Sequence, residues 1–258
     1  MRRVGIDIGS RYVKIARHDA AGRLILEKHD SARFYREYGR ATPEGFVIDM
    51  ESLGLGDYDE VVATGYGRER AKLAGATEIP EIQAHAIGVS AMLGIDTFTL
   101  VDFGGQDTKV IRVENGLVVD FLTSDRCAAS TGRFIENMAR VLGLTVDEIS
   151  QYYENPAPIT STCAVFAETE LLEKLSLGYT VESLAAGVNK AIVKRFAALI
   201  RRFPTDRVAA SGGVAKNTAV IKFLSETLGT RILIPEHPQF AGAIGCLRYG
   251  EVALPSQG

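Results

Sequence analysis

The sequence has no long apolar run and no excess of either charge. None of its hydrophobic stretches reaches the roughly 20 residues that a membrane-spanning helix needs, and a strand-like run begins at Val4 with no room for a signal peptide before it. The net charge is −3, and acidic and basic residues are mixed along the chain, so no basic stripe is available to a phosphate backbone. We therefore expect a cytoplasmic protein that binds neither a membrane nor nucleic acid.

Cysteine is also scarce. The chain of 258 residues holds three, an odd number spaced far apart: Cys127, Cys163 and Cys246. In a reducing compartment this argues against a disulfide framework and leaves metal binding, reactivity or burial as the possible roles of each thiol. Low-complexity linkers are absent too, and a hydrophobic content of 46% is enough for a large core.

Two segments of the chain share one pattern. Residues 4–15 and 100–111 each have the composition of a strand, a glycine-containing turn and a second strand. In both, an Asp ends the first strand, a Gly follows two positions later and a Lys lies seven positions after the Asp: Asp7, Gly9 and Lys14 in one copy, Asp102, Gly104 and Lys109 in the other. We interpret this as an internal duplication that divides the chain near residue 96.

The remaining elements alternate as layered α/β folds require. A strand over residues 60–67 and a helix over 81–93 complete the first half. Later helices are expected at 131–142, 164–177 and 181–202, then a strand, glycine turn and helix from residue 207, a strand at 231–234 and a closing helix at 240–249.

The two glycine turns have the composition of phosphate-binding loops. Glycine has no Cβ, so backbone N–H groups can approach an anion and form a concave nest around it. A single Asp-x-Gly would be an ordinary hairpin turn, but two copies in register favour a polyphosphate clamp whose two Asp residues supply oxygen ligands for Mg²⁺. The candidate residues are Asp7, Gly9, Ser10, Lys14, Asp102, Gly104, Gly105, Gln106, Asp107 and Lys109. Among them, the two lysines, Gln106 and Asp107 are candidates to touch phosphate or to orient the attacking water.

A third glycine turn, residues 211–217, would let a strand pass closely over adenine and ribose, although paired glycines after a strand also serve helix–sheet packing. The candidate ligand-binding residues here are Gly212, Gly213, Lys216 and Asn217, with Gln239 further on. In this order of turns the chain resembles the actin, Hsp70 and sugar-kinase superfamily over nearly its whole length. The resemblance implies two actin-like, ribonuclease H-like α/β lobes with mixed sheets, residues 1–96 and 97–258, and a nucleotide cleft between them.

Cys127 and Cys163 both lie at predicted helix starts beside small residues. A helix N-terminus presents free N–H groups and a partial positive charge, which stabilise a thiolate and an anionic cluster bound to it. A [4Fe–4S] cluster needs four thiolates, and a two-fold dimer would supply two from each chain. A cysteine taken alone is more commonly a buried small hydrophobe, and we expect that role for Cys246, which lies in a run of small residues.

The two cysteine segments, residues 124–136 and 161–170, resemble the activator component of 2-hydroxyacyl-CoA dehydratases, in the family that also contains the ATP-hydrolysing subunits of benzoyl-CoA reductase. The resemblance implies a homodimer whose Cys127 and Cys163 hold one shared [4Fe–4S] cluster. Each subunit would bind ATP, and the dimer, reduced by ferredoxin or flavodoxin, would pass an electron to an iron–sulfur acceptor enzyme. In this interpretation Asp7, Asp102, Gln106 and Asp107 serve ATP hydrolysis. One departure is Ser130, where the family usually has Gly.

Other interpretations are open at this point. A small-molecule kinase of the same superfamily would use Asp107 as its base, but it leaves both cysteine segments unexplained, and the chain is short for an added substrate subdomain. A filament-forming or chaperone-like ATPase would predict long insertions or a separate substrate domain, and the sequence has neither. The acceptor itself, a 2-hydroxyacyl-CoA dehydratase, a benzoyl-CoA reductase or another reductase, is not specified by this chain. We assign no catalytic role to His85, Glu168 or Glu170.

Overall fold

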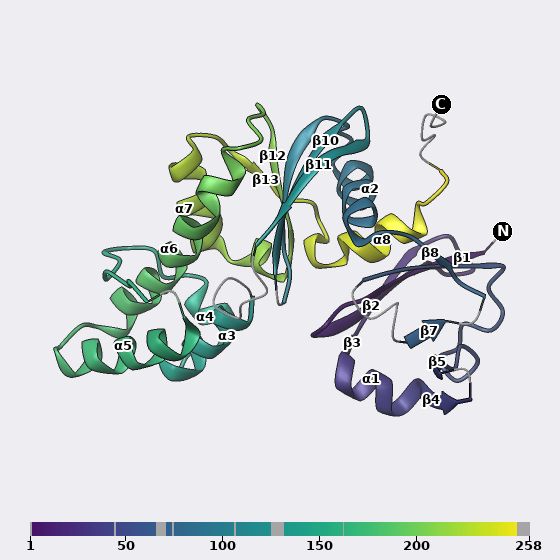
Figure 1. Cartoon of the computed structure of the whole chain (residues 1–258), viewed down its shortest axis with the longest axis horizontal. Helices are drawn as coiled ribbons and strands as arrows, with labels where there is room; N and C mark the ends of the chain where they lie inside the picture. The colour runs from purple at the N-terminus through teal and green to yellow at the C-terminus, as the bar shows by residue number, and fades with distance from the viewer. Residues whose placement is uncertain are drawn as a thin grey trace. The chain divides into compact units, whose positions relative to one another are not determined.

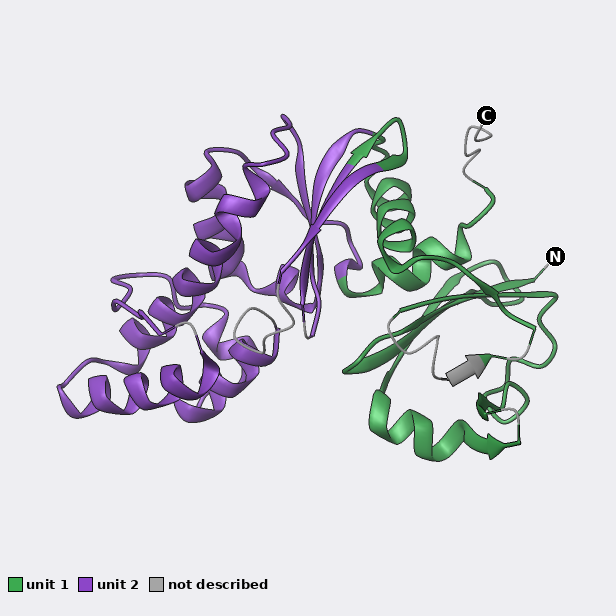
Figure 2. Ribbon diagram, in the orientation of Figure 1, with its two compact units in different colours: residues 1–96, 113–118, 239–258 green, residues 97–112, 119–238 purple. Residues whose placement is uncertain are grey.

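The computed structural model describes residues 2–43, 45–65, 71–73, 75–105, 107–124, 132–161 and 163–251 (Figure 1). These residues form two compact units (Figure 2). Unit 1 comprises residues 1–96, 113–118 and 239–258, and unit 2 comprises residues 97–112 and 119–238. Two segments of the expected second lobe, 113–118 and 239–258, are assigned to unit 1, so the units differ from the expected lobes 1–96 and 97–258.

Unit 1 is built on a five-stranded mixed sheet with the strand order β3-β2-β1-β6-β8. Its strands are β1 (Arg3–Ile8), β2 (Tyr12–His18), β3 (Leu24–Asp30), β6 (Glu60–Thr64) and β8 (Thr77–Glu78). The first three form antiparallel pairs, whereas β6 runs parallel to both β1 and β8. A smaller sheet, β4-β5-β7, contains β4 (Gly39–Thr42), β5 (Gly45–Ile48) and β7 (Ala71–Leu73). The helices of this unit are α1 (Ser31–Tyr38), α2 (Glu81–Leu93) and α8 (Ala241–Leu247).

Unit 2 contains a second five-stranded sheet, with the order β11-β10-β9-β12-β13. Its strands are β9 (Phe98–Phe103), β10 (Thr108–Glu114), β11 (Leu117–Thr123), β12 (Val208–Gly212) and β13 (Ile232–Leu233). Its α-helices are α3 (Gly132–Val141), α4 (Val146–Ile149), α5 (Ala164–Ser176), α6 (Val181–Ile200) and α7 (Thr218–Leu228), and a 3₁₀ helix, Gly213–Lys216, precedes α7. The long helix α6 buries most of its residues, and several of them belong to a core shared with α3, β9 and α7.

The two sheets match strand for strand, which confirms the internal duplication. In each, the strand whose next-to-last residue is Asp occupies the centre of the order, with its hairpin partner on one side and a parallel strand on the other. The register is equivalent as well: Asp7 lies opposite Thr64 of β6, and Asp102 lies opposite Ser211 of β12. Every residue of β9 is buried, as is every residue of β1 after Arg3, because central parallel strands are covered on both faces.

Helix α8 belongs to unit 1 because its small residues allow backbone-to-backbone packing. A Cβ added at Gly5 of β1 would lie 2.1 Å from the Ala243 carbonyl oxygen, and one added at Gly245 would lie 1.7 Å from the Ala84 carbonyl oxygen. No side chain fits in these gaps. Cys246 is fully buried in the same helix, as expected, and burial raises the pKa of its thiol well above the ordinary value.

Most sequence-predicted helices agree with the structure. The helix expected at 81–93 is α2, and those expected at 131–142, 164–177 and 181–202 correspond to α3, α5 and α6 within two residues at each end over the described residues. The closing helix is shorter than the expected 240–249: a 3₁₀ turn, Pro238–Phe240, precedes α8, and α8 ends at Leu247. Within the part of the chain that the structure describes, we find no helix with both the length and the apolar character needed to cross a membrane.

Candidate functional site

Asp7 is the next-to-last residue of β1, the central strand of unit 1, and its side chain is buried. It faces Lys14 across the β1–β2 hairpin, and the Lys14 Nζ donates a hydrogen bond to Asp7 Oδ2 over 2.9 Å. The seven-residue spacing seen in the sequence is therefore the spacing of cross-strand partners. Because a buried carboxylate is costly unless it is paired and hydrogen-bonded, this ion pair holds one carboxylate oxygen in a fixed position at the end of the strand.

Asp102 occupies the equivalent position in unit 2 but has a different neighbour. It is also buried, and it accepts a hydrogen bond of 2.8 Å from the Ser211 hydroxyl on the adjacent parallel strand. In this copy Lys109 forms an ion pair of 2.9 Å with Asp107, a residue of the turn. The duplicated hairpins thus share their backbone and differ in their polar contacts.

A glycine ends the strand next to each of these Asp residues. Gly212 has a φ of 84°, and a Cβ there would lie 2.1 Å from the Phe103 carbonyl oxygen. Gly65, at the end of β6, has a φ of 98°, and a Cβ there would lie 2.8 Å from Asp7 Oδ1. Both positions favour glycine for conformation and for space. Sequence analysis identified Gly212 but missed Gly65, although the pair Thr64-Gly65 is the counterpart of Ser211-Gly212.

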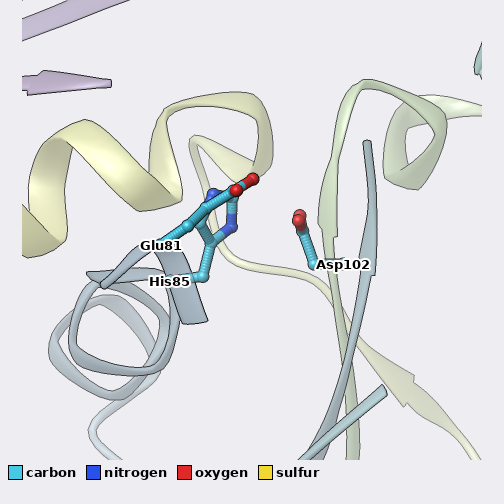
Figure 3. Close-up of side chains that lie close together, drawn as sticks. All are labelled: Glu81, His85 and Asp102. Carbon is cyan, nitrogen blue, oxygen red and sulfur yellow. The ribbon is translucent and has the colours of Figure 1, made fainter. Parts of the chain in front are cut away.

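The surroundings of Asp7 include a histidine to which sequence analysis gave no role. His85 is buried on α2, one turn after Glu81, and a carboxylate oxygen of Glu81 lies within 4.8 Å of a ring nitrogen of His85 (Figure 3). A Cβ on Gly242 of α8 would lie 2.8 Å from His85 Nε2 and 3.1 Å from Asp7 Oδ2. The α8 backbone therefore brings the imidazole and the Asp7 carboxylate to one point of unit 1. Figure 3 also shows Asp102 of unit 2.

The glycines of the two hairpin turns lie close to the backbone across the turn. A Cβ on Gly9 would lie 2.7 Å from the Tyr12 carbonyl oxygen, and one on Gly104 would lie 2.7 Å from that of Asp107. Ser10 and Gly105 follow them and are partly exposed. Gln106 lies outside the described residues, so its predicted role stays a prediction.

The third glycine turn has an exposed part and a buried part. Gly213 and Lys216 are exposed, and a Cβ on Gly213 would meet no atom within 4 Å. Asn217 is buried and caps α7, because its side-chain oxygen accepts a hydrogen bond of 2.9 Å from the Val220 N–H. Its amide donates another, of 2.9 Å, to Asn189 Oδ1. These contacts give Asn217 a structural function. Gln239 is partly exposed and belongs to unit 1, whereas the turn belongs to unit 2.

Cys163 is the N-cap residue of the 13-residue helix α5, as the sequence predicts, and is partly exposed. A thiol at this position lies at the positive end of the helix, which favours bound anions. Val165 and Phe166 in the first turn are 70% and 69% exposed. Cys127 and Ser130 lie outside the described residues, and the pairing of Cys127 with Cys163 stays a prediction.

Comparison with known proteins places this geometry in a family. The model of the BadF/BadG/BcrA/BcrD ATPase family matches residues 4–250. The 2-hydroxyisocaproyl-CoA dehydratase activator of Clostridioides difficile is 39% identical over 202 residues, 76% of this chain and 75% of that protein. The (R)-2-hydroxyglutaryl-CoA dehydratase activating ATPase of Acidaminococcus fermentans is 35% identical over 251 residues, 95% of each chain.

A solved structure of a dehydratase activator is also similar to this chain. The activator of the 2-hydroxyisocaproyl-CoA dehydratase from Clostridium difficile, with bound ADPNP, superimposes with a TM-score of 0.82 and 33% identity, covering 96% of this chain and 94% of that one. The expected fold class, mixed α/β of the actin-like ATPase type, is confirmed. Because the family model spans nearly the whole sequence, including both glycine hairpins and both cysteine segments, this chain belongs to the BadF/BadG/BcrA/BcrD ATPase family.

Proposed function

We propose that this protein is an ATP-dependent electron donor that activates a partner iron–sulfur enzyme, a 2-hydroxyacyl-CoA dehydratase. The observation that carries the proposal is the position of Cys163, a partly exposed thiol at the N-terminus of α5 in a chain of an ATPase family. A thiol that is partly exposed at the positive end of a helix suits a ligand of an anionic cluster. We take a dehydratase as the electron acceptor because relatives of this chain are named as dehydratase activators.

The strand-end carboxylates support binding of Mg²⁺ and ATP. Asp7 and Asp102 offer hard oxygen ligands at equivalent strand ends, and each is held by a hydrogen bond from a neighbouring strand. Residues of the turns that follow them, Gly9, Ser10, Gly104 and Gly105, would present N–H groups to phosphate. A bound Mg²⁺ would offset negative charge on the phosphate oxygens. Lys14, Lys109, Gln106 and Asp107 are proposed to contact phosphate or to orient water, and Gly212, Gly213, Lys216, Asn217 and Gln239 to bind the nucleoside.

The cysteine segments support a shared [4Fe–4S] cluster. Cys163 meets the requirements of a ligand, since its thiol is accessible and lies at the positive end of a helix. With Cys127 each chain would supply two thiolates, so the cluster needs a homodimer. When bound, the cluster supplies one-electron redox chemistry. We further propose ferredoxin or flavodoxin as the electron donor and the cytoplasm as the location.

Coupling requires that the nucleotide change the conformation of the chain. A ligand shifts a conformational equilibrium only by as much as its affinity differs between the two states. ATP and ADP must therefore bind two conformations with different affinities, so that hydrolysis alternates between them. The helices that begin at the cysteine segments, α3 and α5, would carry such a change to the cluster thiolates.

The first test is the iron and acid-labile sulfide content of anaerobically purified protein, with its native mass measured on the same sample. We expect about two irons per chain in a dimer, since one four-iron cluster is shared by two chains. Cys127→Ser and Cys163→Ser should each lose the iron while keeping ATP hydrolysis. If the wild-type protein is folded and hydrolyses ATP but contains no iron, the cluster proposal is wrong. The alternative, a small-molecule kinase, would then be tested with candidate phosphate acceptors.

A further inference from the structure

Glu170 turns back from helix α5 to the segment that precedes Cys163. Its carboxylate accepts hydrogen bonds of 3.0 Å from the Thr160 N–H and 2.8 Å from the Ser161 N–H, and a third of 3.1 Å from the Thr160 hydroxyl. The side chain is only 12% exposed, and the Lys174 ammonium lies 3.7 Å away, one turn further along the helix. Glu170 is thus not the solvated surface carboxylate that its place on a helix would suggest.

Arg195 holds the same segment from another helix. Its Nη2 donates a hydrogen bond of 2.8 Å to the Ser161 carbonyl oxygen, and its guanidinium lies 4.8 Å from the ring centroid of Phe134. Phe134 is fully buried on α3, the helix that begins at Gly132, five residues after Cys127. The N–H and the C=O of Ser161 are therefore both held by charged side chains, one from α5 and one from α6.

These contacts are close enough to limit the movement of Cys163. Two residues of extended chain span at most about 7 Å, so a fixed Ser161 leaves the Cys163 backbone little freedom. Hydrogen bonds to ionised groups are about twice as strong as those between neutral groups. Burial acts to raise the pKa of Glu170, but the hydrogen bonds from Ser161 and Thr160 outweigh it and leave the pKa below its ordinary value, which suits an acceptor that stays anionic.

We propose that Glu170 and Arg195 are positioning residues for Cys163, which clamp residues 160 and 161 so that the thiol keeps its place at the start of α5 as a metal ligand. The ligand role of Cys163 rests on the proposed function. The clamp itself rests on the contacts of residues that sequence analysis left without a role. Its contribution is to the stability and electronic structure of the bound cluster, because a displaced thiolate changes both.

The clamp is tested first in metal-free protein by amide hydrogen exchange. We expect the Thr160 and Ser161 amides to be protected in the wild type and to exchange about tenfold faster or more in Glu170→Ala. The matched control is Glu173→Ala, because Glu173 is an exposed carboxylate on the same helix. Equal exchange in the wild type and Glu170→Ala would overturn the clamp, whether or not the protein binds iron.

The second test uses the cluster-loaded dimer. We expect Glu170→Ala and Arg195→Lys to release iron to a chelator at least about fivefold faster than the wild type, with an altered electron paramagnetic resonance spectrum of the reduced cluster. Glu170→Gln, which keeps one acceptor oxygen, should fall between. Release rates and spectra in these variants equal to those of Glu173→Ala would overturn the positioning role. Wild-type protein without iron would instead defeat the proposed function, and the exchange test separates the two failures.

Discussion

At the scale of single residues, the polar side chains of the candidate site already form ion pairs or hydrogen bonds within the protein. Lys14 is paired with Asp7, Lys109 is paired with Asp107, and Ser211 donates to Asp102. Such contacts hold polar groups in place before any ligand arrives, so that little side-chain entropy remains to be lost on binding. The same contacts mean that a substitution can act on stability as well as on ligand affinity, and the two effects must be measured separately.

Asn217 is the clearest case. We expect Asn217→Ala to lower the free energy of unfolding by about 1–3 kcal/mol, because it removes the N-cap of α7 and leaves the buried Asn189 without its Asn217 donor. Urea unfolding measures the loss. Asn217→Asp keeps the cap acceptor and should recover part of it. Unchanged stability together with weaker ATP binding would instead show that the side chain serves the ligand directly.

Tyr153 gives a prediction about pH. Its hydroxyl donates to the Glu226 carboxylate, and this hydrogen bond, with burial and the charge of Glu226, raises the pKa of Tyr153 to about 12. A raised folded-state pKa stabilises the fold fully below the unfolded value near 10, and this stabilisation is lost as the pH rises through 12. In an alkaline titration followed by absorbance at 295 nm, the curve of Tyr153→Phe should lack one phenol that ionises near pH 12 in the wild type. Tyr179→Phe is the control. If the phenol lost in Tyr153→Phe is one that ionises near pH 10, the assignment is wrong.

At the scale of elements, the packing of α2 on α8 depends on the absence of side chains. Gly88 and Gly245 each face backbone atoms of the other helix so closely that a Cβ would lie 1.9 Å from the Ala241 oxygen and 1.7 Å from the Ala84 oxygen. Neighbouring backbone cannot move as a flexible side chain can, so the two helices would have to separate. This crossing positions Gly242, and with it the point at which His85 and Asp7 meet.

We expect Gly245→Ala to destabilise unit 1 by about 1–3 kcal/mol or more, because overpacking forces backbone shifts in a close-packed interior. The control is Ser90→Ala on α2, whose hydroxyl oxygen is buried and has no hydrogen-bond partner among the described residues. Removing that hydroxyl should leave stability unchanged or slightly raised. Thermal unfolding monitored by circular dichroism compares the two, and an equal midpoint for Gly245→Ala and wild type would disprove the tight crossing.

At the scale of the whole molecule, the last helix of the chain packs against strands that come from its beginning. The core of unit 2 gathers residues from β9 to β13, whereas Ala243, Ile244 and Leu247 of α8 pack with Ala16 of β2 in unit 1. A late segment therefore completes an early unit. Contacts so distant in sequence form slowly, because the loop between them must close first.

Truncation after Pro238 tests this arrangement. We expect loss of α8 to expose the covered faces of β1 and α2 and to unfold unit 1, while unit 2 keeps its own core. Limited proteolysis should then cleave within residues 2–96 and spare residues 119–238. Equal resistance of both units to the protease would show that unit 1 does not need α8.

The sequence by itself determined the duplication, the positions of the longer helices and the two cysteine segments. Local patterns carry these features: the spacing of Asp7, Gly9 and Lys14 follows from the geometry of one hairpin, and α2 begins and ends at the expected residues. The resemblance to an ATPase family followed from motifs of this kind, each contained in a few consecutive residues.

Only the tertiary structure decided which residues from distant segments meet. Gly65, His85 and Gly242 surround Asp7, yet they come from three elements separated along the chain, and sequence analysis gave none of them a role. Sequence analysis gave Glu170 no catalytic role and did not consider Arg195. The contacts of Glu170 with residues 160 and 161 and of Arg195 with Ser161 are seen only in the structure. The physical reason is the same in each case, because a side chain's partners depend on how its element packs, and packing is settled by the whole core.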